Sequence, residues 1–127
     1  MLVDDDDSLR RALARTIRLA GYAVESFRTA DELAQSDALS TGACLVLDIS
    51  LPGTSGADFC RALVAAGRGL PTIFITALDR DDAEAAVAPL APVTVLYKPF
   101  PNDTLLAAID RAWHDRRPEL PQPRSAL

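Results

Sequence analysis

Several features that define other classes of protein are rare or missing in this sequence of 127 residues. Its two cysteines form no C-x-x-C pair and fall in apolar patterns, so Cys44 and Cys60 are interpreted as buried hydrophobic residues in a reducing compartment. The single histidine, His114, falls near the end of the last helical pattern, where a surface role is expected. No apolar run approaches the ~20 residues of a membrane span, and no charged-then-apolar leader is seen, so we expect a cytoplasmic protein without membrane contact.

Positive charge is limited in amount and in kind. The formal net charge is −5, which argues against non-specific binding of nucleic acid by this chain. The basic residues are twelve arginines and a single lysine, Lys98, so arginine is strongly favoured everywhere else. Apolar residues make up 49% of the chain, and a chain of this length can bury its own core, which indicates one globular domain.

The stretch from Cys44 to Gly56 reads C-L-V-L-D-I-S-L-P-G-T-S-G. Its first four residues are apolar without alternation, a pattern typical of a strand buried on both faces of a parallel sheet. The pattern stops at Asp48, and Pro52 with Gly53 then indicates a turn before a new helical pattern. We therefore expect Asp48 at the carboxyl end of a central strand, where open α/β sheets place their ligand crevice. A lone aspartate there often only caps a loop or the next helix, so the other motifs decide its role.

Short strand patterns and amphipathic helical patterns alternate along the chain. Strands are expected at residues 1–3, 22–27, 44–47, 71–76 and 93–97. Helices are expected over residues 9–20, after the capping box at 29–32, over 59–66, over 81–88 and after a cap at Asn102. This βα repeat predicts an α/β fold with a doubly wound five-stranded parallel sheet. Pro89 and Pro92 should keep the fourth helix short.

A small Rossmann-type nucleotide-binding domain is the alternative with the same alternation. That fold uses a glycine-rich loop, G-x-G-x-x-G, after its first strand. Here four aspartates, residues 4–7, occupy that place, and they would repel a nucleotide phosphate unless a cation came between them. The first strand therefore favours a cation site over a nucleotide cradle.

Polar residues that follow the strand patterns should gather at one edge, because parallel strands bring their carboxyl ends together. They are Asp4, Asp5, Asp48, Thr76 and Lys98. Three crowded carboxylates repel one another unless a cation compensates, and Mg²⁺ prefers oxygen ligands and keeps waters that a phosphate oxygen can replace. With a lysine and a hydroxyl nearby, such a site can hold a phosphoryl group in transfer to a carboxylate nucleophile, for which Asp48 is our choice.

Five ordered motifs carry a family resemblance. They are V-D-D-D at residues 3–6, S-L-R-R-A-L at 8–13, D-I-S-L-P-G-T-S-G from Asp48, I-T-A at 75–77 and Y-K-P-F at 97–100. Together they resemble the receiver domain of bacterial two-component response regulators. The resemblance implies a flavodoxin-like (βα)5 fold with strand order 2-1-3-4-5, and we expect a receiver domain over residues 1–115 and a proline-containing tail or start of a linker over 116–127.

The resemblance implies that Asp48 takes a phosphoryl group from a phosphohistidine on a sensor histidine kinase or phosphotransfer protein. Asp5 looks like a direct ligand of Mg²⁺, for which Mn²⁺ is a possible substitute, and Asp4 like a ligand through water. Asp48 itself and the backbone carbonyl of Ser50 complete the implied protein ligands.

Further roles follow from the same resemblance. Thr76 and Lys98 would bind the phosphoryl group, and the Lys98-Pro99 peptide bond would be cis. The Ser50 side chain and Leu78 match positions that tune how long the phosphoryl group survives.

The sequence also departs from the family pattern. Receivers commonly carry Tyr or Phe three residues before the lysine, and its rotation reports phosphorylation, but here that residue is Val95. Tyr97 lies two residues further on, which places it on the same face of the strand but not at the same position. A second departure is the proline-containing stretch after the fourth helix, which suggests a short helix and an altered signalling face or merely a stiffened loop.

We therefore predict a signalling switch that changes a protein interaction when Asp48 is phosphorylated. Expected partners are the kinase, a downstream protein or a missing output domain, and a second copy that would form a homodimer on activation, with no direct nucleic acid. Enzyme activity is expected only as Mg²⁺-dependent self-phosphorylation from a donor and slow autodephosphorylation. One alternative, favoured by Val95, is a phosphorylation-independent interaction module. An aspartate-based phosphohydrolase is disfavoured because it needs a second acid where Ser50 stands.

Overall fold

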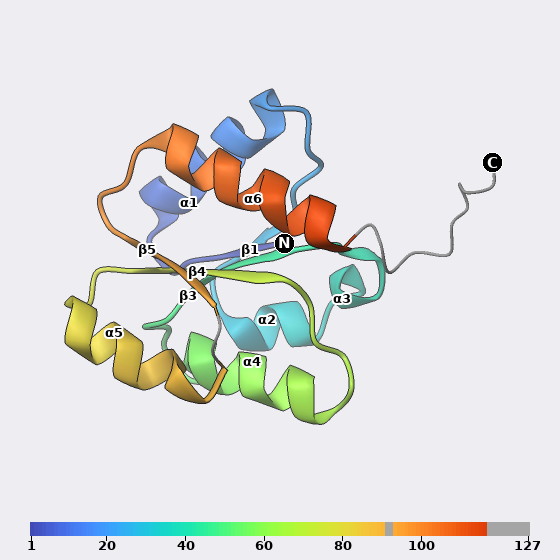
Figure 1. The fold of residues 1–127 in the computed structure, drawn as a ribbon. Coiled ribbons are helices and arrows are strands. Elements are labelled where there is room, and N and C mark those ends of the chain that lie inside the picture. Colours follow the sequence, from blue (N-terminus) through green and yellow to red (C-terminus); the bar gives the residue numbers. More distant parts are fainter. Residues whose placement is uncertain (91–92, 117–127) are drawn as a thin grey trace.

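A computed structural model describes residues 1–90 and 93–116, with the backbone alone at 115–116. Its centre is a five-stranded parallel sheet in the order β2-β1-β3-β4-β5, which confirms the predicted topology (Figure 1). The strands are β1 (Leu2–Val3), β2 (Ser26–Phe27), β3 (Leu45–Asp48), β4 (Thr72–Thr76) and β5 (Thr94–Tyr97). The central position of β3 places its last residue, Asp48, near the middle of one sheet edge.

Helices cover both faces of the sheet (Figure 1). On one face lie α1 (Asp7–Leu19) and α6 (Asn102–Arg116). On the other lie α2 (Ala30–Ala34), α3 (Ala38–Thr41), α4 (Gly56–Ala65) and α5 (Arg80–Val87), the last continued by a 3-10 helix (Ala88–Leu90). Among the described residues, no helix is long and apolar enough to cross a membrane.

The unbroken apolar run of β3 follows from burial on both faces. Leu45 and Leu47 pack in the core beneath α2 to α5, whereas Val46 packs in the core beneath α1 and α6. All four residues of β3 are buried, and the strand pairs with β1 on one side and β4 on the other. A strand with two dry faces has no polar alternation, because neither face meets water.

Polar caps begin four of the helices near the carboxyl edge of the sheet. Each cap side chain accepts a hydrogen bond from an amide in the first helical turn: Asp6 from Leu9, Thr29 from Glu32, Ser55 from Asp58 and Asp79 from Asp82. The capping box at 29–32 differs in one detail, since Glu32 accepts from the amide of Arg28 rather than that of Thr29. These caps begin each helix within a few residues of the preceding strand. The βα loops are therefore short and lie together at the carboxyl edge of the sheet.

Several local predictions need correction. The strand expected over 22–27 is ordered as a strand only at β2, and the short helix α3 was not expected. Asn102 is the first residue of α6 rather than its cap, since the Pro101 carbonyl already accepts from the amide of Thr104. Cys60 is buried as expected, but Cys44 is only half-buried. The tail or linker expected over 116–127 lies outside the described residues, except that α6 ends at Arg116.

Candidate functional site

Three carboxylates meet at the carboxyl ends of β1 and β3. Asp4 and Asp5 follow β1, Asp48 ends β3, and one oxygen from each lies within 4.8 Å of the others. Asp4 is fully buried and Asp48 is 4% exposed, whereas Asp5 is exposed to solvent. The parallel pairing of β1 with β3 therefore brings together the acids that the sequence separates by more than forty residues.

The single lysine reaches the same point from β5. Lys98 Nζ lies 2.9 Å from Asp4 Oδ2 and 2.9 Å from Asp48 Oδ2, and its side chain is 19% exposed. The Lys98 amide donates to the Thr76 carbonyl at 2.7 Å, and the Lys98-Pro99 peptide bond is cis. Lys98 thus bridges the two buried carboxylates as a compact point charge.

Backbone amides hold the remaining carboxylate oxygens of the buried pair. The Asp6 amide donates to Asp4 Oδ1 and the Ser50 amide to Asp48 Oδ1, each at 2.9 Å. Asp4 and Asp48 are therefore oriented by donors on both oxygens, while the Ser50 side chain itself is exposed.

Thr76 ends the strand between β3 and β5. Its side chain is fully buried, and its hydroxyl oxygen accepts a hydrogen bond of 3.0 Å from the Leu78 amide. Because β4 pairs with β3 and with β5, Thr76 lies between the strands that carry Asp48 and Lys98. All of the predicted catalytic and metal-site residues therefore lie at this one edge.

Burial and pairing shift the ionisation of the central groups in different ways. Burial raises the pKa of the Asp48 carboxyl, and hydrogen bonds from Lys98 and the Ser50 amide offset only part of that rise. Burial alone would lower the pKa of the Lys98 ammonium, but the hydrogen bonds to Asp4 and Asp48 outweigh it, so that pKa is raised. Lys98 accordingly stays charged at neutral pH.

The donor set fits a hard divalent cation. Three carboxylates and one ammonium leave about two negative charges uncompensated at the site when all are ionised. The three side chains that offer ligand atoms here are all carboxylates, whose oxygens are the type that Mg²⁺ prefers, and Asp5 is the exposed one of the three. A cation there would balance the charge that Lys98 alone does not.

Comparison with known proteins now decides the family. A family model described as the response regulator receiver domain matches residues 1–110. The chain belongs to this family. Signal transduction in two-component systems is therefore its general setting, and the sheet order described above is that of its structural relatives.

Individual relatives agree with the assignment. Nodulation protein W of Bradyrhizobium diazoefficiens is 37% identical over 108 residues, which are 85% of this chain and 48% of that protein. The C4-dicarboxylate transport transcriptional regulatory protein DctD of Pseudomonas aeruginosa is 36% identical over 119 residues, 92% of this chain and 25% of that one. The solved structure of response regulator StyR matches with a TM-score of 0.81 and 34% identity over 91% of this chain and 58% of that chain. The receiver thus spans about half or less of these two relatives' length.

Val95 stands three residues before Lys98, where receivers commonly carry an aromatic residue, and the structure shows how the residues around this position pack. Val95 and Tyr97 are half-buried and pack on the same side of β5, toward α5, as the strand alternation predicts. The guanidinium of Arg80, the first residue of α5, lies 4.6 Å from the centre of the Tyr97 ring. Tyr97 also pairs in register with Thr76 across the sheet. Tyr97, the residue before Lys98, is therefore in contact with α5.

Gly56 is a residue of this receiver whose importance the sequence reasoning missed. It is the first residue of α4, and its amide donates to the Ile49 carbonyl at 2.9 Å. A Cβ at this position would overlap the carbonyl oxygen of Asp48 and lie 3.1 Å from Ile49 Cα. A glycine directly after the capping Ser55 was the available signal, because glycine permits such close backbone approach.

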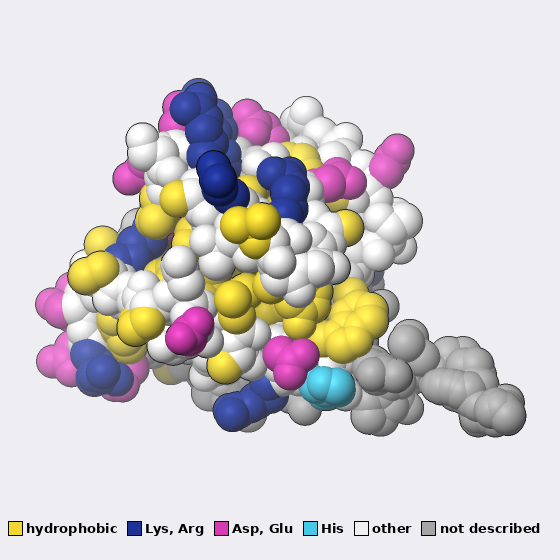
Figure 2. Space-filling view, turned by 90° about the horizontal axis from the view of Figure 1, so that it is seen from above, with side chains coloured by type: hydrophobic (Ala, Val, Ile, Leu, Met, Phe, Trp, Pro, Cys, Tyr) yellow, Lys and Arg dark blue, Asp and Glu magenta, His cyan; other side chains and the backbone are white. Residues whose placement is uncertain are grey.

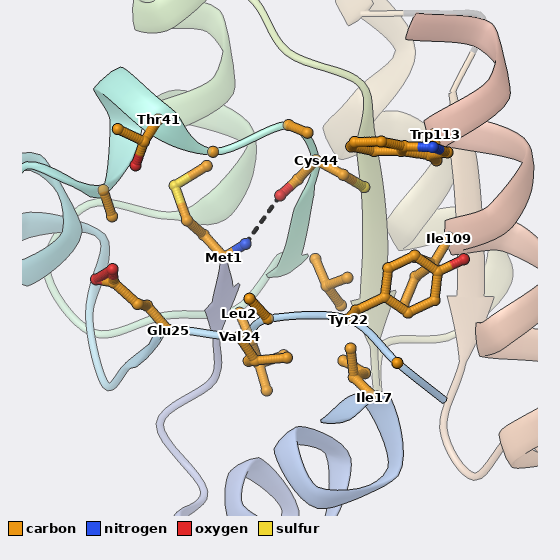
Figure 3. Close-up of a pocket in the computed structure, with 16 residues that line it drawn as sticks. Met1, Leu2, Ile17, Tyr22, Val24, Glu25, Thr41, Cys44, Ile109 and Trp113 are labelled. Atoms are coloured by element: carbon orange, nitrogen blue, oxygen red, sulfur yellow. Dashed lines mark hydrogen bonds between the residues drawn. The ribbon is translucent and has the colours of Figure 1, made fainter. Parts of the chain in front are cut away.

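A separate pocket of the described receiver lies away from the carboxyl edge of the sheet. A cavity of about 580 Å³ opens at the amino-terminal ends of the strands, where Met1, Tyr22, Cys44 and Trp113 line it (Figure 3). Its lining is mostly apolar, and it contains none of the predicted site residues. The candidate site is therefore identified by its polar side chains and not by this apolar pocket.

The raised pKa of Asp48 predicts a pH-dependent stability in metal-free protein. Between the ordinary aspartate pKa and the raised one, the folded state holds more protons than the unfolded state, so this group's contribution to the unfolding free energy falls as pH rises. Asp48→Asn cannot titrate. We expect the unfolding free energy of Asp48→Asn, measured by urea denaturation with a chelator, to rise relative to that of the wild type as the pH increases above the ordinary aspartate pKa of about 4.

A matched control is Asp37→Asn, which alters an exposed carboxyl that makes no cap hydrogen bond. It should track the wild type across the same range. A difference between Asp48→Asn and the wild type that stays constant with pH would contradict the expected ionisation.

Proposed function

We propose that Asp48 accepts a phosphoryl group from a phosphohistidine of a sensor histidine kinase or phosphotransfer protein. The observation that carries the proposal is the Asp48 carboxylate held between Lys98 and the Asp4 and Asp5 carboxylates at the end of the central strand. In the transfer, an Asp48 oxygen forms a bond to phosphorus while the bond from phosphorus to the histidine nitrogen breaks, and the histidine leaves with the bonding pair.

Each neighbouring residue has a role in this proposal. Asp5 would ligate Mg²⁺ directly, with Mn²⁺ as a possible substitute, and Asp4 would act through water, together with Asp48 and the carbonyl of Ser50. The cation supplies compensation for the negative charge of the incoming phosphoryl group. Lys98, already 2.9 Å from an Asp48 oxygen, would pair with a phosphoryl oxygen.

The response to phosphorylation would begin at Thr76. Its hydroxyl, which now accepts from the Leu78 amide, can donate its proton to a phosphoryl oxygen if the loop after β4 adjusts. That loop leads within a few residues to Arg80, whose contact with Tyr97 joins α5 to β5. Such a shift would alter the surface of α5 and β5 offered to an output domain, a downstream protein or a second copy. The Ser50 side chain and Leu78 would tune the lifetime of the phosphorylated state.

A phosphorylation-independent interaction module is the second candidate. The observation that favours it is Val95, which leaves this position of β5 without the aromatic ring that reports phosphorylation in receivers. In that case the acidic site would persist while the α5 and β5 surface bound its partner without regard to Asp48.

Intact-mass analysis tests the proposal directly. Purified protein is incubated with acetyl phosphate, with Mg²⁺ or with a chelator, and compared with Asp48→Asn and with Asp37→Asn as a matched control. We expect the wild type and Asp37→Asn to gain one phosphoryl group only with Mg²⁺, and Asp48→Asn to gain none. A folded wild type that binds Mg²⁺ but gains no phosphoryl group would contradict the proposal and favour the second candidate.

A further inference from the structure

We infer that Arg10 is a positioning residue of the cation site, which holds the peptide between Asp4 and Asp5 so that Asp5 faces the other two carboxylates. The inference rests on the cation site of the proposed function. It extends that site to a residue of α1 that follows the acidic loop in sequence and folds back over it.

Arg10 makes two directed contacts with this loop. Its Nη1 donates to the carbonyl oxygen of Asp4 at 2.9 Å, and its Nη2 lies 2.8 Å from Asp7 Oδ1. The Arg10 side chain is only 13% exposed. Asp7 Oδ1 also lies 3.4 Å from Arg28 Nε, so the carboxylate that pairs with Arg10 has a second basic partner.

The contact with the Asp4 carbonyl bears on Asp5 through peptide geometry. The carbonyl of Asp4 and the nitrogen of Asp5 belong to one rigid plane, so a donor on the carbonyl fixes the direction in which the chain leaves toward Asp5. Asp4 itself has other anchors, since its amide donates to Phe27 and its carboxylate is bound by Lys98 and the Asp6 amide. Asp5 is exposed, so its side chain is not held by surrounding packing. The orientation of the Asp4–Asp5 peptide therefore determines where the Asp5 carboxylate lies.

A purely electrostatic role for Arg10 predicts the opposite result on substitution. A positive charge close to three carboxylates repels a cation, so removing the charge should strengthen Mg²⁺ binding if charge alone matters. Removing a positioning group should weaken it, because the ligands lose their arrangement. The sign of the change therefore separates the two roles.

Arg11 provides a matched control. It is the next residue of α1, carries the same charge and is exposed, as are Arg15 and Arg18. Figure 2 looks onto the face that α1 and α6 cover and shows basic side chains standing out from it. Arg11→Ala thus removes one positive charge near the site without removing a contact to Asp4.

The test is a calorimetric Mg²⁺ titration of metal-free wild type, Arg10→Ala, Arg10→Lys and Arg11→Ala at one ionic strength. We expect Arg10→Ala to bind about tenfold more weakly and Arg11→Ala to bind as tightly as the wild type or slightly more tightly. Arg10→Lys keeps the charge but lacks the planar guanidinium with its two donor groups. Its Mg²⁺ affinity should therefore lie between those of Arg10→Ala and Arg11→Ala. The Asp6 amide in the same loop donates to Asp4 Oδ1, and its hydrogen exchange in the metal-free protein should be faster in Arg10→Ala.

The outcomes separate this inference from the proposed function, because the titration uses no phosphodonor. Arg10→Ala binding Mg²⁺ as tightly as the wild type, or more tightly, overturns the inference, as does a wild type that binds no Mg²⁺. A wild type that binds Mg²⁺ but takes no phosphoryl group leaves the inference standing and overturns the proposed function. If Arg10→Ala does not fold, Arg10→Lys decides, since affinity equal to the wild type in that variant overturns the positioning role.

Discussion

Lys98→Met is expected to lower the unfolding free energy of the metal-free protein by about 3 kcal/mol at neutral pH. The side chain is the shared ion-pair partner of Asp4 and Asp48, both buried, and its loss leaves two carboxylates facing each other without a counter-charge. Methionine keeps much of the volume of the aliphatic part of the lysine side chain. The loss of unfolding free energy should therefore come from the missing charge and not from a cavity. Urea denaturation measures it, and acetyl phosphate should also leave far less phosphorylated protein.

Arg11→Met is the control for this substitution, because it removes an exposed positive charge from the same chain. Its unfolding free energy should stay within about 0.5 kcal/mol of the wild type. The loss in Lys98→Met should also shrink as pH falls and Asp48, whose pKa is raised by burial, takes up a proton. A loss of unfolding free energy below about 1 kcal/mol at neutral pH would contradict the prediction. It would show that Lys98 and the two carboxylates interact as weakly as a solvated surface ion pair.

Gly56→Ala is expected to destabilise the protein by about 3 kcal/mol and to impair phosphoryl uptake at Asp48. The added Cβ would overlap the carbonyl oxygen of Asp48, and its three nearest atoms are all backbone atoms of Asp48 and Ile49, so no flexible side chain can give way. Relief requires α4 to move away from the end of β3, which carries the phosphoryl-accepting side chain in our proposal. Helix propensity alone predicts the opposite sign, since alanine is favoured over glycine by about 1 kcal/mol inside a helix.

Gly69→Ala tests whether the effect is specific to this position. A Cβ on Gly69 would meet a Val64 side-chain carbon at 3.4 Å, which is ordinary contact, and its backbone does not need the left-handed region. Gly69→Ala should therefore keep both its stability and its phosphoryl uptake. Urea denaturation and intact-mass analysis measure the two properties, and a Gly56→Ala variant as stable as the wild type would show that the close approach at Asp48 is dispensable.

Local patterns were sufficient wherever one residue type has one strong structural meaning. The apolar run before Asp48 predicts a strand without a wet face, and β3 is buried on both faces. The capping residue Thr29 begins a helix at the expected place, whereas α4 begins at Gly56, before the expected range of 59–66. Weak signals were less reliable: the strand expected over 22–27 forms only at β2, where pairing with β1 reaches, since strand formation depends on a partner.

The site shows the same division. Polar residues at strand ends could be collected from the sequence because parallel strands share a carboxyl edge, and Asp4, Asp5, Asp48 and Lys98 do meet there. The pattern did not indicate that Asp4 would be fully buried, that Lys98 would bridge two acids, or that Arg80 would lie over Tyr97. These contacts join residues up to 94 positions apart and depend on strand register and side-chain rotamers.

The sequence by itself determined the order of the elements, the parallel sheet and the identity of the residues at its carboxyl edge, because hydrophobic periodicity and caps act over a few neighbouring residues. Only the tertiary structure decided how closely α4 approaches Asp48 at Gly56 and how Arg10 reaches back to the Asp4 carbonyl. Both depend on where whole helices sit against the sheet. That placement results from packing of the two cores as a unit, which no local pattern encodes.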